Sequence, residues 1–336
     1  MKRLLAVLFI GLLLATMTVA GCDKAAPNEV ECHLSNPNAT RQANLLYNYI
    51  REVNTHQVIS GQQESTWMDS PDYEMDYIYE HTGKYPAIRG LDFINDDFDG
   101  VVERAKAWAA LGGIVTICWH TSPNLDGGYE DCQNGRLTME EWDLLTTDGT
   151  PQNLAYKQGL DKAGRALMEL QEAGIPVLWR PYHEFNGWWF WWGKQGGDNF
   201  RKLWIMTYEY MTYELQLNNL IWVLGFSYTG LMMEDFYPGE EYYDIIGADS
   251  YYVNINGAEP RLYNGIIELA GDDKPLCMHE TGLIPTVEQF AEAPWVYFMT
   301  WHTTWLIEDN DPDDLCALYN DPYVITLSDL PDFYGK

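Results

Sequence analysis

Basic residues are scarce in this sequence of 336 residues. Lysine and arginine together number 20 against 50 aspartates and glutamates, which gives a formal net charge of -30 at pH 7. So acidic a chain repels nucleic acids and other polyanions, and we exclude them as partners. A neutral polymer remains compatible with this charge. An acidic surface also keeps an exported protein soluble, so the charge by itself identifies no ligand.

Cysteine is also sparse, and its spacing matches no metal-binding pattern. The chain has no C-x-x-C or H-x-x-x-H spacing and no glycine-rich strand-to-helix loop, so we expect no metal, nucleotide or other cofactor. Cys118 and Cys277 stand in apolar runs and are expected to be buried thiols. Cys32, Cys132 and Cys316 stand in polar segments, where an oxidising compartment permits one disulfide. The sequence leaves that pair open.

Long hydrophobic runs are absent except at the start of the chain. A charged Met1-Lys2-Arg3 precedes the apolar run Leu4 to Met17, which is typical of a secretory signal and too short for a membrane span. The following Val19-Ala20-Gly21-Cys22 resembles a bacterial lipobox. We therefore expect a signal peptide over 1–21, lipidation at Cys22 and a polar tether over 22–39. The alternative is an ordinary signal peptide cut nearby.

This N-terminal pattern predicts an exported bacterial lipoprotein, anchored in a membrane of the cell envelope by its lipid. The protein would be periplasmic or exposed on the cell surface, and the sequence does not say which leaflet holds it. Protein partners and the oligomeric state are also open.

Linkers, composition shifts and internal repeats are lacking over residues 40–336, which favours one domain. Apolar runs of strand length alternate with segments of helical spacing such as 100–111, 156–173, 199–217 and 263–269. The eight runs cover 58–61, 86–92, 113–119, 177–182, 220–225, 245–249, 275–280 and 294–301. This alternation predicts an α/β fold, a single (β/α)8 TIM barrel with its active site at the carboxyl ends of the strands.

The stretch Ile175 to Gly193 is the most informative one. An apolar run ends in Arg180, His183, Glu184 and Asn186, and five consecutive aromatic residues follow. One face of a strand or helix cannot bury five consecutive aromatic side chains. We therefore expect a partly exposed aromatic wall beside a carboxylate. Such a wall suits a sugar ring, whose C–H faces stack on indole. The alternative is a structural ion pair of Glu184 with Arg180 and a buried aromatic core.

A second carboxylate, Glu280, ends the seventh run as Glu184 ends the fourth. Strands four and seven lie roughly across a barrel, so the two carboxyls can face each other over a bound sugar. Retaining glycoside hydrolysis needs an acid/base and a nucleophile about 5 to 5.5 Å apart. We predict Glu184 as the acid/base, because the aromatic residues would desolvate it, and Glu280 as the nucleophile. The alternative for Glu280 is an ordinary ion pair.

The motifs from Gln57 onward resemble glycoside hydrolase family 26, a group dominated by β-mannanases. W-R-P-Y-H-E-F-N-G-W-W-F-W-W-G is similar to the acid/base signature of that family. Weaker matches are G-Q-Q at 61–63, P-A-I-R-G-L-D at 86–92, G-G-I-V-T-I-C-W-H at 112–120, N-L-I-W-V at 219–223, D-I-I-G-A-D-S-Y at 244–251, H-E-T-G at 279–282 and Y-F-M-T-W at 297–301.

The resemblance implies roles for further residues. His120 and His183 match histidines that contact the sugar on the glycone side, and Trp189 matches a stacking indole. Tyr251 resembles a tyrosine that orients the nucleophile, and Trp301 resembles the platform beneath the central sugar.

Two further residues match the motif, and two depart from the pattern. Arg180 and Asn186 match, and are expected to hold the loop and the carboxylates. Gln62 stands where a histidine often occurs, and His302 where we expect asparagine, which leaves the subsite preference open.

The resemblance implies a retaining endo-β-1,4-mannanase acting on mannan, glucomannan or galactomannan. The alternatives are a mixed-linkage β-glucanase, a β-xylanase, an exo-acting enzyme that releases mannobiose, and a non-catalytic lipid-anchored glycan-binding protein. We expect the polar stretch 127–142 to be the loop that decides between endo and exo action. Tolerance of galactose side chains stays open.

Overall fold

The computed structural model describes residues 30–53, 56–251 and 257–335, and residues from Cys32 to Lys336 form one compact unit. The predicted signal peptide and Cys22 lie outside the described residues. Within the predicted tether, Leu34 is buried and the Ser35 amide donates to Asp244 Oδ1 at 2.6 Å. None of the described helices is long and apolar enough to span a lipid bilayer.

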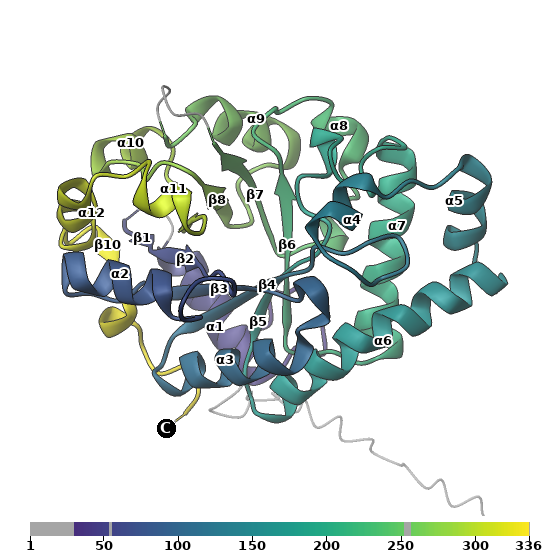
Figure 1. Cartoon of the computed structure of the whole chain (residues 1–336), viewed down its shortest axis with the longest axis horizontal. Coiled ribbons are helices and arrows are strands. Elements are labelled where there is room, and N and C mark those ends of the chain that lie inside the picture. The colour runs from purple at the N-terminus through teal and green to yellow at the C-terminus, as the bar shows by residue number, and fades with distance from the viewer. Residues whose placement is uncertain (1–29, 54–55, 252–256, 336) are drawn as a thin grey trace, which may run out of the picture. The chain divides into compact units, whose positions relative to one another are not determined.

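Eight parallel strands form a closed barrel, as predicted (Figure 1). Nearly all of their residues are buried, because helices cover a parallel sheet from outside, and β4 and β6 are almost continuously apolar. The strands are β2 (Gly61–Gln63), β3 (Ile88–Asp92), β4 (Ile114–Cys118), β5 (Val177–Arg180), β6 (Leu220–Phe226), β7 (Ile245–Ser250), β8 (Leu276–Thr281) and β9 (Phe298–Thr300). The ring closes where Gln62 of β2 pairs with Thr300 of β9.

The first predicted strand, 58–61, is divided in the structure. Its first part, β1 (Val58–Ile59), pairs outside the barrel with β10 (Val324–Ile325), and the barrel strand β2 begins only at Gly61. The Ser60 hydroxyl between them donates to the carbonyl of Ile325 at 2.7 Å. Local apolarity does not reveal this division, because both pieces are fully buried.

Helices surround the barrel, and the four predicted helical segments are confirmed by α3, α6, α7 and α9 (Figure 1). The helices are α1 (Arg41–Val53), α2 (Tyr73–Thr82), α3 (Phe98–Ala110), α4 (Tyr129–Asn134), α5 (Met139–Thr146), α6 (Pro151–Glu172), α7 (Gly197–Glu209), α8 (Met233–Phe236), α9 (Pro260–Ala270), α10 (Val287–Glu292), α11 (Thr304–Ile307) and α12 (Pro312–Tyr319). The longest, α6, begins at Thr150, whose hydroxyl caps the Asn153 amide, with Pro151 in the first turn.

The stretch 127–142, which we expected to be a loop, contains α4 and the first half of α5. The start of α5 is specified locally: the Thr138 hydroxyl accepts from the Glu141 amide, and Glu141 accepts from the Thr138 amide at 2.7 Å. This reciprocal capping explains why a polar segment is helical. The segment is thus not a continuous loop, and its influence on endo or exo action stays a prediction.

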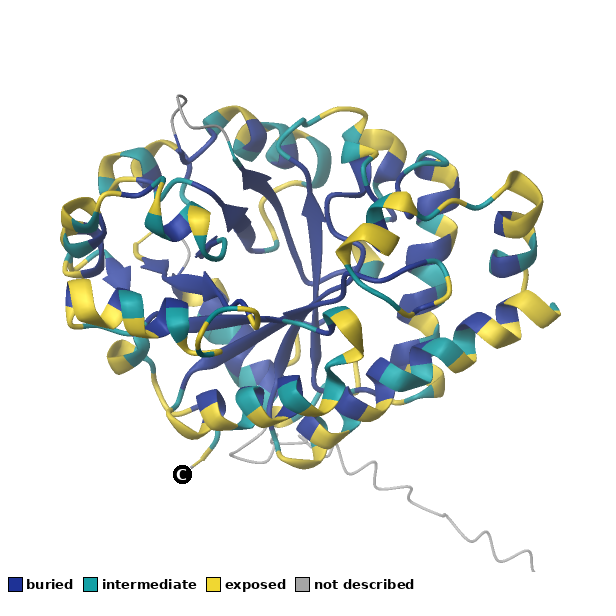
Figure 2. Cartoon of the chain, viewed as in Figure 1, coloured by how far each residue is buried: buried dark blue, intermediate teal, exposed yellow. Residues whose placement is uncertain are grey.

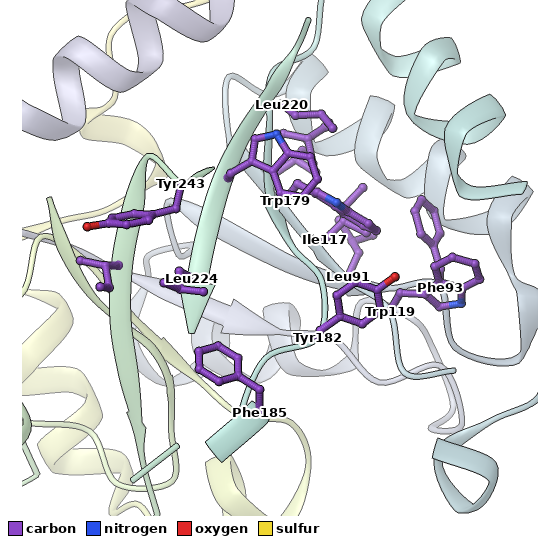
Figure 3. Close-up of a cluster of buried hydrophobic side chains, with 14 of the residues drawn as sticks. Leu91, Phe93, Ile117, Trp119, Trp179, Tyr182, Phe185, Leu220, Leu224 and Tyr243 are labelled. Carbon is purple, nitrogen blue, oxygen red and sulfur yellow. The ribbon is translucent and has the colours of Figure 1, made fainter. Parts of the chain in front are cut away.

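The barrel strands are almost entirely buried, whereas the outer faces of the helices are exposed (Figure 2). Between strands and helices lies a large cluster that includes Leu91, Ile117 and Trp179 (Figure 3). A second cluster joins α1 to strand residues such as Ile88 and Ile245. Because Tyr47 of α1 donates to the carbonyl of Asp244, just before β7, α1 closes the amino end of the barrel. The carboxyl ends of the strands are left for a site.

The cysteines from Cys32 onward are all free thiols in the structure. Cys118 and Cys277 are buried, as predicted, and Cys132 is buried as well. The described residues therefore contain no disulfide.

Candidate active site

The loop after β5 carries Glu184 in a backbone conformation that is costly for a residue with a side chain. Tyr182, Glu184 and Trp188 all have positive φ values, of 50°, 56° and 67°. A left-handed conformation costs roughly 1–2 kcal/mol for each such residue. The Glu184 amide donates to the carbonyl of Gly225 at 2.8 Å, and the Trp192 indole donates to the carbonyl of His183 at 2.8 Å. These contacts to β6 and within the loop hold the strained conformation.

The five aromatic residues after the loop are not all part of an exposed wall. Phe190, Trp191 and Trp192 are buried, Trp189 is half-buried and Trp188 is exposed. The Trp191 indole donates to the carbonyl of Thr121 at 2.8 Å. The prediction was wrong for Trp191 and Trp192, which pack under the loop and fix its shape, whereas Phe190 is buried but still lines the cavity beside Glu184.

Glu184 is almost fully buried and receives one hydrogen bond from a side chain. The Trp189 indole donates to Glu184 Oε2 at 2.6 Å, which fixes both groups. The Trp189 ring stacks on Tyr228, which follows β6, with centroids 5.8 Å apart and planes at 20°. The loop thus presents the carboxyl beside two aromatic rings.

Glu280, at the end of β8, is surrounded by donors. Arg180 donates to Oε1 at 2.5 Å, Tyr251 donates to Oε2 at 2.6 Å, and His183 Nε2 lies 3.2 Å from Oε1. Burial raises the pKa of Glu280, the Arg180 guanidinium opposes that rise and the Glu184 carboxylate adds to it. Arg180 and Tyr251 stabilise the ionised form that a nucleophile requires.

A third carboxyl, Asp249 on β7, lies beside the two glutamates. One carboxylate oxygen from each of Glu184, Asp249 and Glu280 lies within 4.8 Å of the other two. The separation of the two glutamates fits the retaining geometry rather than the wider inverting one. We did not single out Asp249 from the sequence, because an aspartate at a strand end is usually a helix or turn cap.

The two histidines expected at the site lie together, with ring centroids 4.7 Å apart. His120 Nδ1 contacts Asp92 Oδ2 at 2.5 Å. Burial works against the charged form of His120, but Asp92 outweighs burial and raises the pKa of His120. Burial and Arg180 hold the pKa of His183 well below its usual range, so His183 is neutral at pH 7.

Asn186 lies away from the carboxylates. Its amide nitrogen donates to the carbonyl of Leu231 at 3.1 Å, and its oxygen accepts from the Ser227 amide at 2.7 Å. Asn186 therefore ties the loop after β5 to the loop after β6.

The cleft consists of two adjoining cavities. One, of about 500 Å³, is lined by Glu184, Glu280, Trp189 and Tyr228 among others. The other, of about 390 Å³, extends towards β2 and includes Trp67. Both cavities share the residues His120, Tyr129, Trp301 and Trp305. The cleft thus continues on both sides of the glutamates.

The two residues that depart from the family pattern support Trp301. Gln62 donates to the carbonyl of Trp301 at 3.1 Å, and the His302 ring lies 4.9 Å from the Trp301 ring. His302 also packs edge-on against the exposed Trp67 at 4.5 Å. Burial lowers the pKa of His302 to about 4, so its ring is neutral at pH 7.

Several cleft residues were missed from the sequence, namely Trp67, Tyr129, Tyr228 and Trp305. Tyr228 could have been predicted, because it is an aromatic residue two positions after the end of a barrel strand, β6. Tyr129 belongs to α4 and reaches the cleft only through the fold of that helix.

Two clusters of metal-ligating side chains occur among the described residues, and neither suits a metal ion. In the cluster of Glu184, Asp249 and Glu280, the Arg180 guanidinium already supplies a positive charge and repels a cation. In the cluster of Asp92, Cys118 and His120, His120 Nδ1 is bound to Asp92, and burial raises the pKa of Cys118 well above its usual range.

Comparison with known proteins identifies the family. A mannan endo-1,4-β-mannosidase of Thermothelomyces thermophilus is 31% identical over 95% of this chain and 67% of its own length. Mannan endo-1,4-β-mannosidase A and B of Caldalkalibacillus mannanilyticus is 30% identical over 90% of this chain and 64% of its own length. The chain thus spans about two thirds of these relatives.

A solved structure agrees with the sequence comparison. A β-mannanase from a symbiotic protist of the termite Reticulitermes speratus, complexed with gluco-manno-oligosaccharide, superposes with a TM-score of 0.82. It is 30% identical and covers 90% of this chain and 98% of that one. Residues 35–329 match Glycosyl hydrolase family 26, and the chain belongs to this family.

Proposed function

We propose that this protein is a retaining endo-β-1,4-mannanase, with Glu184 as acid/base and Glu280 as nucleophile. The observation that carries the proposal is the pair of glutamates, whose nearest oxygens lie within 4.8 Å at the carboxyl end of a family 26 barrel. The relatives named above as mannan endo-1,4-β-mannosidases support mannan as the polymer.

In the first step, Glu280 attacks the anomeric carbon of the sugar bound beside it. The bond from that carbon to the bridging oxygen breaks, and Glu184 gives its proton to this oxygen. Arg180 and Tyr251 hold Glu280 at both oxygens, so the carboxylate enters the reaction already oriented.

In the second step, water replaces the leaving sugar. Glu184, now ionised, takes a proton from the water, and the water oxygen bonds to the anomeric carbon. The bond to Glu280 breaks and its carboxylate is restored. Two displacements on the same carbon retain the β-configuration.

The shape of the cleft supports attack within a chain. Glu280, the nucleophile, defines the glycone side, and Glu184, the proton donor, defines the aglycone side. Aromatic rings line both sides: Trp189 and Tyr228 stand beside Glu184, and Trp67 lines the cavity towards β2. Sugars bound in both cavities place the scissile bond inside the polymer.

The test is to incubate the chain from residue 23 onward with mannan, mixed-linkage glucan and xylan separately, and to resolve the products by length over time. We expect early products of many lengths from mannan. Mannobiose alone from the first time point would indicate an exo-acting enzyme. Cleavage of glucan or xylan only would change the substrate, and binding without any cleavage would indicate a glycan-binding protein.

Replacing Tyr251 by phenylalanine should reduce kcat/KM about 10- to 100-fold, because a hydrogen bond to a charged group contributes about 1.5–3 kcal/mol. Burial raises the pKa of Glu280 and the Tyr251 hydrogen bond lowers it. Loss of the hydroxyl therefore raises the pKa further, and the acidic limb of the pH profile should move to higher pH. Tyr237→Phe, remote from the cleft, is the control. An unchanged acidic limb would contradict this role.

We also propose that the protein is exported and held at a membrane of the cell envelope by a lipid on Cys22. The support is the signal-like segment and the lipobox-like motif before Cys22. Cys22→Ser should move the protein from the membrane fraction to the soluble fraction without changing its activity. Equal membrane association of both forms would refute a lipid anchor.

A further inference from the structure

Asp249 is a buried carboxyl to which the proposed two-step reaction assigns no role. It is 1% exposed and lies on β7 directly opposite Glu280 of β8. The pairing of these strands shifts register between Ala248 and Asp249. Such an irregularity re-aims side chains at the end of a strand, and here it brings Asp249 into the carboxylate cluster.

The partners of Asp249 do not suit an ionised carboxylate. Its Oδ1 accepts one hydrogen bond, from the Tyr228 amide at 2.5 Å. Its Oδ2 is buried and, among the described residues, receives no donor. Glu280, by contrast, is held by Arg180 and Tyr251. A buried charge with one neutral donor is costly, whereas a protonated carboxyl avoids that cost.

The neighbours of Asp249 indicate where its proton points. Glu184 from the loop after β5 and Glu280 of β8 each place a carboxylate oxygen within 4.8 Å of an Asp249 oxygen, and Tyr251 follows directly after β7. Two carboxyl groups in contact form a hydrogen bond only if one of them carries a proton. Each of the two carboxyls accepts one neutral donor, but Glu184 is 7% exposed and Asp249 only 1%, so burial disfavours the Asp249 anion more.

We propose that Asp249 stays protonated and donates a hydrogen bond to Glu184, acting as a positioning residue for the acid/base. This inference rests on the proposed role of Glu184. The hydrogen bond holds the Glu184 carboxyl in place and stabilises the anion that Glu184 becomes after it has protonated the leaving oxygen. The buried position of Asp249 near two carboxylates raises its pKa well above the usual range, in agreement.

The first test compares Asp249→Asn with Asp249→Ala through the pH dependence of kcat/KM, on whichever glycan the unmodified protein cleaves. The amide of asparagine still donates to Glu184 and accepts from Tyr228, so the basic limb should stay in place. Alanine removes the donor that stabilises the Glu184 anion, so the basic limb of the profile should move up by about one pH unit.

An ionised Asp249 makes the opposite prediction, because removal of its negative charge would relieve repulsion of the Glu184 anion and move the basic limb to lower pH. A downward shift of the basic limb in Asp249→Asn would therefore overturn the proposal, even if the alanine variant failed to fold. Unchanged limbs in a folded Asp249→Ala would overturn it as well.

A second measurement does not depend on activity. At neutral pH the infrared spectrum of the parent protein should contain the carbonyl band of a protonated carboxyl, and Asp249→Asn, with Glu184 retained, should lose the intensity of one such group. An unchanged band in Asp249→Asn, or its absence from the parent, would show that Asp249 is not the proton carrier. If the protein proved to have no hydrolytic activity, the proposed function would be refuted, but the infrared spectrum would still show whether Asp249 is protonated.

Discussion

Replacing Glu280 by alanine is expected to lower the turnover of mannan about 10⁴-fold or more, because the covalent route disappears with the nucleophile. The change also leaves the buried Arg180 without its carboxylate partner. Removal of one partner from a buried ion pair costs roughly 3–5 kcal/mol of stability. Thermal unfolding must therefore be measured beside activity, and Glu280→Gln provides a variant of the same shape.

Azide makes this test specific for a nucleophile. The alanine variant leaves space beside Arg180, where the small anion can bind and attack the anomeric carbon. One displacement replaces two, so the glycosyl azide should have the inverted α-configuration. Glu288→Ala, an exposed glutamate on α10, is the matched control and should behave as the unmodified protein. Near-normal mannan hydrolysis by a folded Glu280→Ala variant would refute the assignment.

Replacing Glu184 by alanine is expected to lower the turnover of mannan about 10²- to 10⁴-fold, the usual contribution of a general acid/base. The loss should depend on the leaving group. An aryl β-mannoside with an acidic phenol needs no protonation, so its first step should stay fast. The second step lacks a base, and the glycosyl-enzyme should accumulate as a burst of phenol and an adduct visible by mass spectrometry.

Azide also distinguishes the roles of the two glutamates in this variant. In Glu184→Ala the covalent intermediate still forms on Glu280, and azide then attacks it in a second displacement. The product should be the retained β-glycosyl azide, the opposite anomer to that from Glu280→Ala. An α-product, or no gain from the acidic phenol, would show that Glu184 is not the acid. Trp189→Phe removes the indole donor and keeps the Glu184 carboxyl. Its activity should depend on the leaving group nearly as little as that of the unmodified protein.

Much of the barrel could be predicted from sequence, because each strand is a short apolar run between helical segments. Residues that end those runs, such as Arg180 and Glu280, come together for a topological reason: carboxyl ends of parallel strands share one end of a barrel. The contact of Tyr251 with Glu280 was expected from family resemblance alone. Spacing along the chain does not specify it.

The remaining features depend on side-chain packing that has no local signature. The sequence of five aromatic residues does not reveal that Trp191 and Trp192 point inwards, because burial is decided by the strained turn at Glu184. Asp249 stands at the end of a strand, where an aspartate usually caps a helix or turn. Only the register shift between β7 and β8 places it in the cluster with Glu184 and Glu280. Tyr129 reaches the cleft because the polar segment after β4 folds into the helix α4.

The pairing of β1 with β10 has a consequence for how the chain folds. Ser60 and Ile325, which are joined by a hydrogen bond beside this pair, are 265 positions apart, and the ring itself closes only when Gln62 of β2 meets Thr300 of β9. Such non-local contacts make folding slow. In the meantime β2 and β9 present unpaired edges that can join another copy. Mutual repulsion between chains with a net charge of -30 counters that association while the barrel is still open.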